Sequence, residues 1–336
     1  MKRLLLPVIF FLLLFIISLS GFFWWRENSL APSSVGEKVR VVITKGKSAQ
    51  EIANLLKEQG LIRNPLAFKL YVQFKGKSEN IQAGEYRLSP NLSLSQIVDE
   101  LLKGPSQLWI TIPEGLRREE IVERFIKGLE MDAGKAPTFR KEFFEDKNAE
   151  EGFLFPDTYL MPRDVSASLV VKRMREVFDQ MLAGEAKEAI SKTKYSLAEI
   201  VTLASIIERE TKTDSERPVV AGILFNRLDI GMGLQVDASL QYAVANAKCK
   251  MLNAKCENWW PILSKEDLRI ESPYNTYKYR GLPPAAIANP GLSSLKAVVF
   301  PQETNYLYYL HDADGVIHFA ATLDEHNENV RKYLGN

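Results

Sequence analysis

The longest unbroken apolar stretch lies at the start of the chain and runs from Leu4 to Trp25 without a charged residue. Its twenty-two residues suit a bilayer-spanning helix and exceed the apolar core of most signal peptides. Two tryptophans at its end suit a membrane interface, and the two basic residues before it favour the cytoplasm. The pattern predicts an uncleaved single-pass anchor over residues 1–25, with the remainder exported. Cleavage after Ser29-Leu-Ala31, a weak small-x-small site, is the alternative.

Three later segments share a pattern in which a short apolar strand, a turn and a helix start follow one another. They are residues 41–52, 84–97 and 110–121, and apolar residues recur at helical spacing after each turn. Small strand-helix units of this kind resemble LysM-type modules, which bind N-acetylated glycans. We therefore expect a linker at 26–38 and a LysM-like domain at 39–130. A strand-helix repeat that serves only as a spacer or scaffold is the alternative.

The rest of the chain predicts a polar connector at 131–150 and a second domain at 151–336. The predicted helices of this domain cover residues 166–183, 197–212, 215–229, 238–245 and 323–333, and strands at 306–310 and 316–320 flank a hairpin turn at 312–315. The fold class is therefore α+β: an N-terminal transmembrane helix, LysM-like strand-helix modules and a mixed α+β domain. The sequence has no doubly wound pattern and no Gly-rich phosphate loop.

The helix predicted from Leu197 carries the most informative residue, Glu208. At about 100° per residue, Glu208 falls within the arc formed by the aliphatic side chains. A carboxyl group pressed against aliphatic side chains is desolvated, which favours its protonated form and suits a general acid. The alternative is a glutamate near the helix end that reaches solvent.

Composition excludes several function classes. The formal net charge of +1, without a dense basic run, gives no electrostatic case for nucleic acid. The three histidines all lie near the C-terminus and no Gly-x-Ser-x-Gly segment occurs, so a hydrolytic triad is not supported. Cys249 and Cys256 predict a local structural disulfide in an exported protein and make only half a zinc site. We expect no metal and no cofactor.

Cleavage of a glycosidic bond fits these residues better, because it needs one carboxyl group as acid and usually a second across the sugar. Glu208 is the best acid. Candidates for the second carboxylate are Glu216 and Asp237, each at the predicted start of a helix. Both have a structural alternative: Glu216 as a first-turn charge and Asp237 as a cap or turn residue.

Several motifs together resemble the YceG-like, or MltG, family of membrane-anchored endolytic murein transglycosylases. They include Leu203-Ala-Ser-Ile-Ile-Glu-Arg-Glu-Thr211, Ser215-Glu-Arg217, Phe225-Asn-Arg-Leu228, Ser272-Pro-Tyr-Asn-Thr-Tyr277, Gly281-Leu-Pro-Pro284, Pro290-Gly291, Ser294-Leu-Lys-Ala297 and the Ile112-Pro-Glu-Gly115 turn. The resemblance covers essentially all of the chain after the anchor. No single motif is specific, but Tyr-Asn-Thr-Tyr followed by Gly-Leu-Pro-Pro at this spacing is.

The resemblance implies that Glu208 is the catalytic acid and base of a non-hydrolytic reaction. Glu208 would protonate the oxygen between N-acetylmuramic acid and N-acetylglucosamine, then accept the proton of the muramic C6 hydroxyl, which closes a 1,6-anhydro ring. Attack by an internal hydroxyl has a high effective molarity and needs no positioned water. The residues expected to bind substrate are Gln235, Asp237, Tyr274, Asn275, Thr276, Tyr277 and Glu216.

The resemblance further implies an inner-membrane protein with a cytoplasmic N-terminus and a periplasmic catalytic domain. Peptidoglycan glycan strands are the expected partner, and the family works beside peptidoglycan synthases. Two other interpretations stay open: a non-catalytic glycan-binding scaffold of cell-wall synthesis, and a muramidase-type hydrolase in which Glu216 or Asp237 activates water. The segment 246–262 departs from the family, and its Trp259-Trp260 pair predicts either a sugar-stacking platform or a packed loop pinned by a disulfide.

Overall fold

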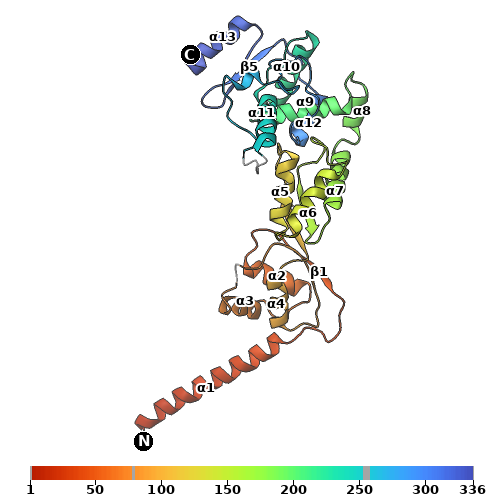
Figure 1. Ribbon diagram of the computed structural model, residues 1–336. Helices are drawn as coiled ribbons and strands as arrows, with labels where there is room; N and C mark the ends of the chain where they lie inside the picture. Colours follow the sequence, from red (N-terminus) through yellow and green to blue (C-terminus); the bar gives the residue numbers. More distant parts are fainter. Residues whose placement is uncertain (1, 78–79, 253–257, 336) are drawn as a thin grey trace. The chain divides into compact units, whose positions relative to one another are not determined.

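The computed structural model describes residues 2–77, 80–252 and 258–335 (Figure 1). The chain forms two compact units, which are described separately. The first comprises Met1–Ile110 and Tyr159–Asp164, and the second comprises Thr111–Thr158 and Val165–Asn336. Residues 111–150, for which the sequence predicts the end of a LysM-like domain and a connector, thus belong to the same compact unit as Glu208. The predicted domain boundaries differ from this division because contacts, rather than composition, define the units.

The N-terminal helix α1 spans Lys2–Ser29. Its segment Phe10–Ser29 is long and apolar enough to cross a membrane, and its side chains from Phe10 to Trp24 are exposed in the isolated chain. An exposed apolar helix of this length is compatible with the predicted single-pass anchor.

The first unit is built on a sheet of strand order β1-β2-β3-β4, in which the β1–β2 and β2–β3 pairs are antiparallel. Its elements are β1 (Val39–Ile43), α2 (Ala49–Glu58), α3 (Pro65–Phe74), β2 (Gly84–Leu88), α4 (Leu94–Lys103), β3 (Gln107–Thr111) and β4 (Thr158–Pro162). In the β1–β2 pair Val41 lies opposite Tyr86, and both side chains belong to the core of this unit.

Local sequence explains the helices that follow the strands. Capping boxes start two of them, with Ser48 and Glu51 at α2 and Ser93 and Gln96 at α4. The predicted strand-turn-helix repeats at 41–52 and 84–97 therefore form. α3 and β4 were not predicted, and a LysM identity for this unit stays a prediction.

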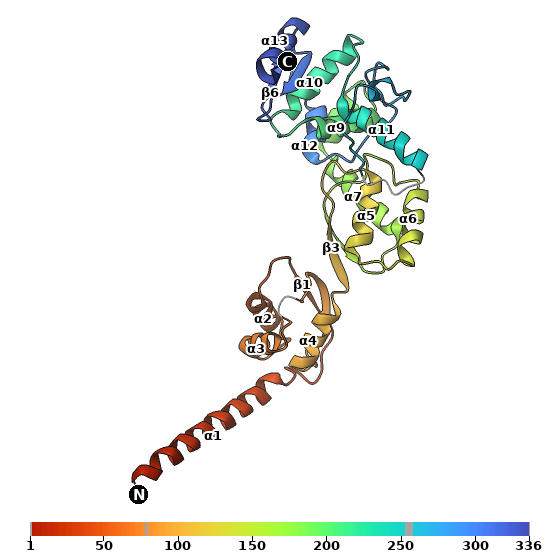
Figure 2. The ribbon, with the colours of Figure 1, turned by 60° about the vertical axis from the view of Figure 1, so that its left-hand side comes forward.

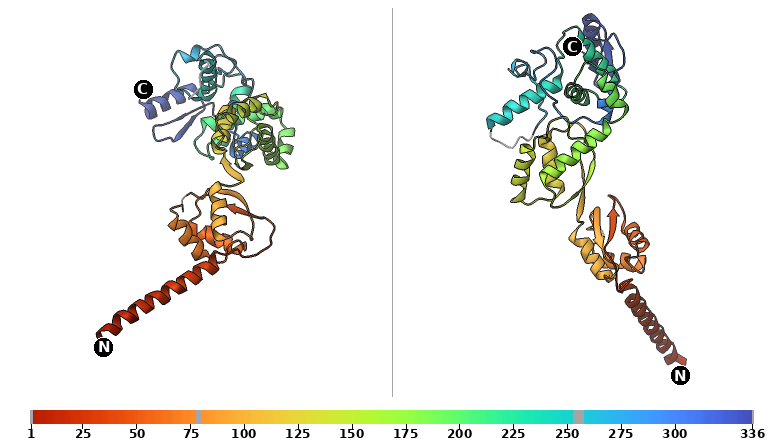
Figure 3. Two further views of the ribbon diagram at one scale, coloured as in Figure 1. Left: turned by 60° about the horizontal axis from the view of Figure 1, so that its bottom comes forward. Right: turned by 90° about the vertical axis from the view of Figure 1, so that its right-hand side faces the viewer.

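The second unit is mostly helical. Its elements are α5 (Arg118–Gly128), α6 (Lys135–Glu145), α7 (Ala167–Met181), α8 (Glu185–Ser191), α9 (Leu197–Glu210), α10 (Arg217–Asp229), α11 (Asp237–Leu252), a 3-10 turn (Asp267–Arg269), α12 (Leu292–Val299), β5 (Tyr308–His311), β6 (Ile317–Ala320) and α13 (Leu323–Leu334). The predicted hairpin forms, with Leu310 of β5 opposite His318 of β6. Helix α13 packs against this hairpin (Figure 3).

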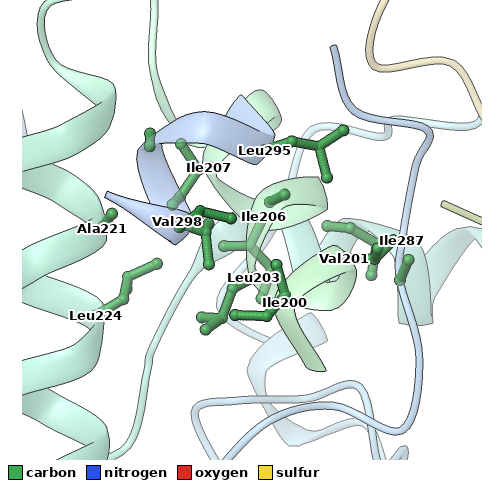
Figure 4. Packing of buried hydrophobic residues seen from close by; sticks show 14 of the residues in the cluster. Ile200, Val201, Leu203, Ile206, Ile207, Ala221, Leu224, Ile287, Leu295 and Val298 are labelled. Atoms are coloured by element: carbon green, nitrogen blue, oxygen red, sulfur yellow. The ribbon is translucent and has the colours of Figure 1, made fainter. Parts of the chain in front are cut away.

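Helix α9 lies at the centre of this unit, in contact with α10, α11 and α12 (Figure 2). Every residue from Ile200 to Ile207 is buried, and the aliphatic side chains of α10 and α12 fill the space around them (Figure 4). A capping box of Ser196 and Glu199 sets the start of the helix. The last turn of α9, which carries Glu208, is thus held on a rigid element.

Candidate active site

The Glu208 carboxyl group lies where three elements meet, and its side chain is only 7% exposed. Its Oε1 accepts a hydrogen bond from Arg217 Nη2 at 3.2 Å. Its Oε2 accepts from the backbone N–H of Gly291 at 2.9 Å and from Ser294 Oγ at 2.8 Å. Gly291 is the N-cap of α12, so Glu208 sits at the positive end of that helix.

The prediction that aliphatic side chains surround this carboxyl group is therefore wrong. Glu208 is largely buried, as the helix periodicity indicates, but its oxygens meet hydrogen-bond donors from two other elements. Periodicity reports which face of α9 turns inward and does not report what packs against the end of that face. Arg217 at the start of α10 and the first turn of α12 occupy the place where aliphatic side chains were expected.

Asn289 joins the segment before α12 to the 112–116 turn. The buried Asn289 side chain accepts hydrogen bonds from the N–H groups of Gly152 and Leu154, and donates to the Leu116 carbonyl and to Glu151. Its backbone carbonyl also accepts from Gly115 N–H at 2.9 Å. These bonds hold the 112–116 turn beside the last turn of α9.

The turn places a second carboxyl group, Glu114, beside Glu208. A β-carbon built on Gly291 would lie 1.8 Å from Glu114 Oε1, so the Glu114 carboxyl group rests directly on Gly291. The same Gly291 donates its N–H to Glu208, and a β-carbon on Gly115 would lie 3.5 Å from Glu208 Cγ. The Glu114 side chain reaches the surface. Partial burial raises the pKa of Glu114, and the Glu208 charge raises it further, against the lowering effect of Arg217.

Glu216, the first predicted second carboxylate, is buried and tied to other groups. Its Oε2 accepts from the backbone N–H of Lys212 at 2.9 Å and lies 3.2 Å from His311 Nε2. Burial acts to raise the pKa of Glu216, but these hydrogen bonds outweigh burial and lower it. The contacts support a structural role at the start of α10, and a substrate contact by Glu216 stays a prediction.

Asp237, the other predicted second carboxylate, is exposed at the start of α11, and its Oδ1 accepts from Tyr277 Oη at 2.7 Å. Gln235 is also exposed and adopts a φ of 48°, an unusual left-handed backbone for a residue other than glycine. Its N–H donates to the Thr276 carbonyl. The structure thus brings Gln235, Asp237 and Tyr277 together on one exposed edge.

The remaining residues of the Tyr-Asn-Thr-Tyr segment build the turn itself. Asn275 is buried and donates both amide N–H bonds, to the carbonyls of Leu268 and Ile270. Thr276 is buried and accepts from Val236 N–H at 3.0 Å. Tyr274 is half-buried, and its ring packs against that of Tyr242 at a tilt of 46°, with centroids 4.7 Å apart. These contacts support the turn structure; direct sugar binding by the three residues stays a prediction.

The Trp259-Trp260 pair packs against arginines. The Arg117 guanidinium lies 4.5 Å from the Trp259 ring, and that of Arg209 lies 3.8 Å from the Trp260 ring. Trp260 Nε1 also donates to Glu120. These contacts favour the packed loop over the sugar platform.

The predicted disulfide beside that loop lies partly outside the described residues. Cys249 is disulfide-bonded, whereas Cys256 falls in the undescribed segment. The geometry of a Cys249–Cys256 bridge therefore stays a prediction.

Sequence reasoning selected Glu208 and missed its partners. Arg217, Gly291, Ser294 and Glu114 all lie in motifs that support the family resemblance, but no role was assigned to them. Glu114 lies in a predicted strand-turn-helix segment and Arg217 near the start of a predicted helix, whereas the sequence analysis predicts no element around Gly291 and Ser294. Only the fold shows that these segments meet.

The fold and site define a class of protein: an α+β chain whose central helix carries a buried glutamate in its last turn. The first turns of two further helices hold that glutamate. The profile of the YceG-like family matches residues 41–332, so the chain belongs to the YceG-like family. Over 346 aligned residues it is 33% identical to the endolytic murein transglycosylase of Bacillus subtilis, with 95% of this chain and 91% of that relative covered.

Two further comparisons agree with this membership. The endolytic murein transglycosylase of Streptococcus pneumoniae is 27% identical over 97% of this chain, which spans 65% of that longer relative. The crystal structure of a putative YceG-like protein from Listeria monocytogenes superimposes with a TM-score of 0.54 at 30% identity. That match covers 88% of this chain and 99% of the Listeria chain.

Proposed function

We propose that this protein is an endolytic peptidoglycan lytic transglycosylase that cuts the bond between N-acetylmuramic acid and N-acetylglucosamine in nascent glycan strands. Family membership and the names of its relatives support this reaction class. The observation that carries the assignment of the site is Glu208, held by three donors on a rigid core helix with Glu114 beside it.

In the proposed reaction a proton passes from Glu208 to the bridging oxygen as its bond to the muramic C1 breaks. The muramic O6 then bonds to C1, and its proton returns to Glu208, so no water is consumed. Of the three donors, Arg217 and the Gly291 N–H can only donate, which fixes the position of the carboxyl group while its proton moves.

Glu114 has a supporting role in this proposal. A carboxyl group that is partly buried beside another negative charge holds its proton to higher pH than an isolated one does. The raised pKa of Glu114 therefore favours its protonated form relative to an ordinary glutamate. Gln235, Asp237 and Tyr277 form an exposed edge suited to sugar hydroxyls and are the proposed substrate contacts.

A muramidase-type hydrolase is the second candidate, because Glu114 supplies the second carboxyl group that a hydrolase uses. We assign the second carboxyl group to Glu114 rather than to Glu216 or Asp237, whose carboxylates accept bonds from His311, Lys212 and Tyr277. The two candidate reactions differ in their products.

The proposed setting is a single-pass inner-membrane protein with a cytoplasmic N-terminus and a periplasmic catalytic unit, working beside peptidoglycan synthases. The apolar helix α1 supports the anchor. We propose that the catalytic part includes the 112–116 turn in addition to residues 151–336, because that turn carries Glu114. A glycan-binding role for the LysM-like unit is part of the same proposal.

Mass spectrometry of the products from uncrosslinked glycan strands tests the function. Internal fragments with 1,6-anhydro-muramic ends are expected from the full chain in detergent. Glu208→Gln removes the general acid and should lower the rate by about 10²- to 10⁴-fold. Glu303→Gln, at an exposed glutamate, is the matched control and should cut normally. Reducing ends would establish the hydrolase, and glycan binding without cleavage by either protein would establish the scaffold.

A further inference from the structure

Helix α3 in the first unit presents apolar side chains on two faces. Its buried face includes Phe68 and Val72, as expected of a core helix. On the other side Leu66, Leu70 and Phe74 are 52%, 46% and 89% exposed. Their spacing of four residues places them in one stripe along the helix. A contiguous apolar stripe on a water-exposed surface marks an interaction site.

Helix α3, which carries this stripe, contacts α1 within the first unit (Figure 1). The Trp25 and Tyr71 rings lie 5.8 Å apart between centroids. Together with Leu70 and Phe74 these rings line an apolar hollow of about 450 Å³. The exposed stripe is therefore continuous with the last turns of the proposed membrane anchor.

Polar contacts hold α1 and the start of α3 in this arrangement. The Arg63 guanidinium donates to the Ala31 carbonyl at 2.9 and 3.1 Å and pairs with Glu27 near the end of α1. Because Ala31 and Glu27 flank the end of α1, the direction of that helix and the position of α3 are coupled.

The charged residues between positions 63 and 77 are all basic, and one of them, Arg63, pairs with Glu27 of α1. Between residues 63 and 77 the sequence contains Arg63, Lys69, Lys75 and Lys77 and neither aspartate nor glutamate. Lys75 and Lys77 are exposed directly after Phe74, at the end of the stripe. Basic residues beside an apolar stripe match the phosphate groups and acyl chains of an anionic lipid surface.

We propose that α3 lies on the outer surface of the bilayer that α1 crosses, with Leu66, Leu70 and Phe74 in the acyl-chain boundary. Lys75 and Lys77 then meet the lipid phosphates. The inference rests on the proposed membrane anchor and assigns the first unit a second attachment beside it. A tight attachment fixes the orientation of this unit on the membrane, which a single helix alone does not.

Spin-label accessibility in vesicles tests the proposal. The full chain with Phe74→Cys is labelled and placed in vesicles of phosphatidylcholine and phosphatidylglycerol, and collisions with oxygen and with a water-soluble nickel chelate are measured. Phe15→Cys in α1 is the lipid reference, and Glu58→Cys on the exposed side of α2 is the water reference. Since Cys249 is disulfide-bonded, the chain without an added cysteine supplies the background.

The expected result is an oxygen-to-nickel ratio at Phe74→Cys several-fold above that at Glu58→Cys and close to that at Phe15→Cys. Adding Lys75→Glu and Lys77→Glu should lower the ratio at Phe74→Cys. A ratio equal to the water reference would overturn the proposal. Low accessibility to both reagents, with spin–spin broadening, would show a second copy on the stripe and also overturn it. An oxygen-to-nickel ratio at Phe15→Cys equal to that at Glu58→Cys would instead show that α1 does not cross the bilayer.

Discussion

Replacing Gly291 with alanine tests whether the position of the Glu114 carboxyl group matters for catalysis. The new β-carbon would lie 1.8 Å from Glu114 Oε1 and 2.7 Å from Oε2. Restoring van der Waals contact requires Glu114 to move by roughly 1.5 Å or more. Gly291 has φ −78° and ψ 172°, which alanine adopts without strain, and the displaced group is the end of a flexible side chain. Stability should therefore change by no more than about 1 kcal/mol.

Catalysis should respond far more strongly, because a displacement of about 1 Å in an active site can lower the rate about 100-fold. The assay is the rate of formation of 1,6-anhydro ends, with the melting temperature measured in parallel. In a Glu114→Ala background the same Gly291→Ala change should have little further effect, since its target is absent. A Gly291→Ala protein with an unchanged rate, or with the same loss in the Glu114→Ala background, would refute the role of Glu114.

Three further predictions follow from Asn289, Glu151 and Glu114 in the second unit. Asn289→Ala should lower the free energy of unfolding by roughly 3–5 kcal/mol in urea titration, because it leaves several buried partners unbonded, whereas Asn148→Ala at the surface should change little. A small loss for Asn289→Ala would show that the Asn289 hydrogen bonds do not hold the 112–116 turn in place. Burial first, and the Glu119 charge second, raise the pKa of Glu151 to about 8, so the folded chain binds more protons than the unfolded chain between about pH 4.5 and 8 and its stability falls across that range. Glu151→Gln should remove that slope in melts taken at several pH values, and an unchanged slope would contradict the assignment. Glu114→Gln should move the alkaline limb of the pH–rate profile to lower pH; an unshifted limb would show that Glu114 holds no proton for the reaction.

The elements of the fold follow largely from local sequence. The twenty-two-residue apolar run, the capping boxes at Ser48, Ser93 and Ser196 and the hairpin turn before Val316 are each set by residues within a few positions of one another. Helix α3 was missed because its outer face is as apolar as its inner face, so it lacks the one-sided pattern of a surface helix.

For the site, the sequence alone determined which residue to examine. Glu208 lies at the end of a strongly apolar helix, and helix periodicity is a local property that turns its side chain inward. The surrounding motifs determined the family, because their types and spacing are read directly from the chain.

Only the tertiary structure decided what surrounds that carboxyl group. Glu114 and Gly291 are far apart in sequence and meet because the buried Asn289 joins their segments by hydrogen bonds. A pattern of polar and apolar positions predicts which side of an element is buried, but it carries no information on which other element covers that side. The donors to Glu208 and its neighbouring carboxyl group come from such long-range contacts, and so does the placement of the α3 stripe beside the end of α1.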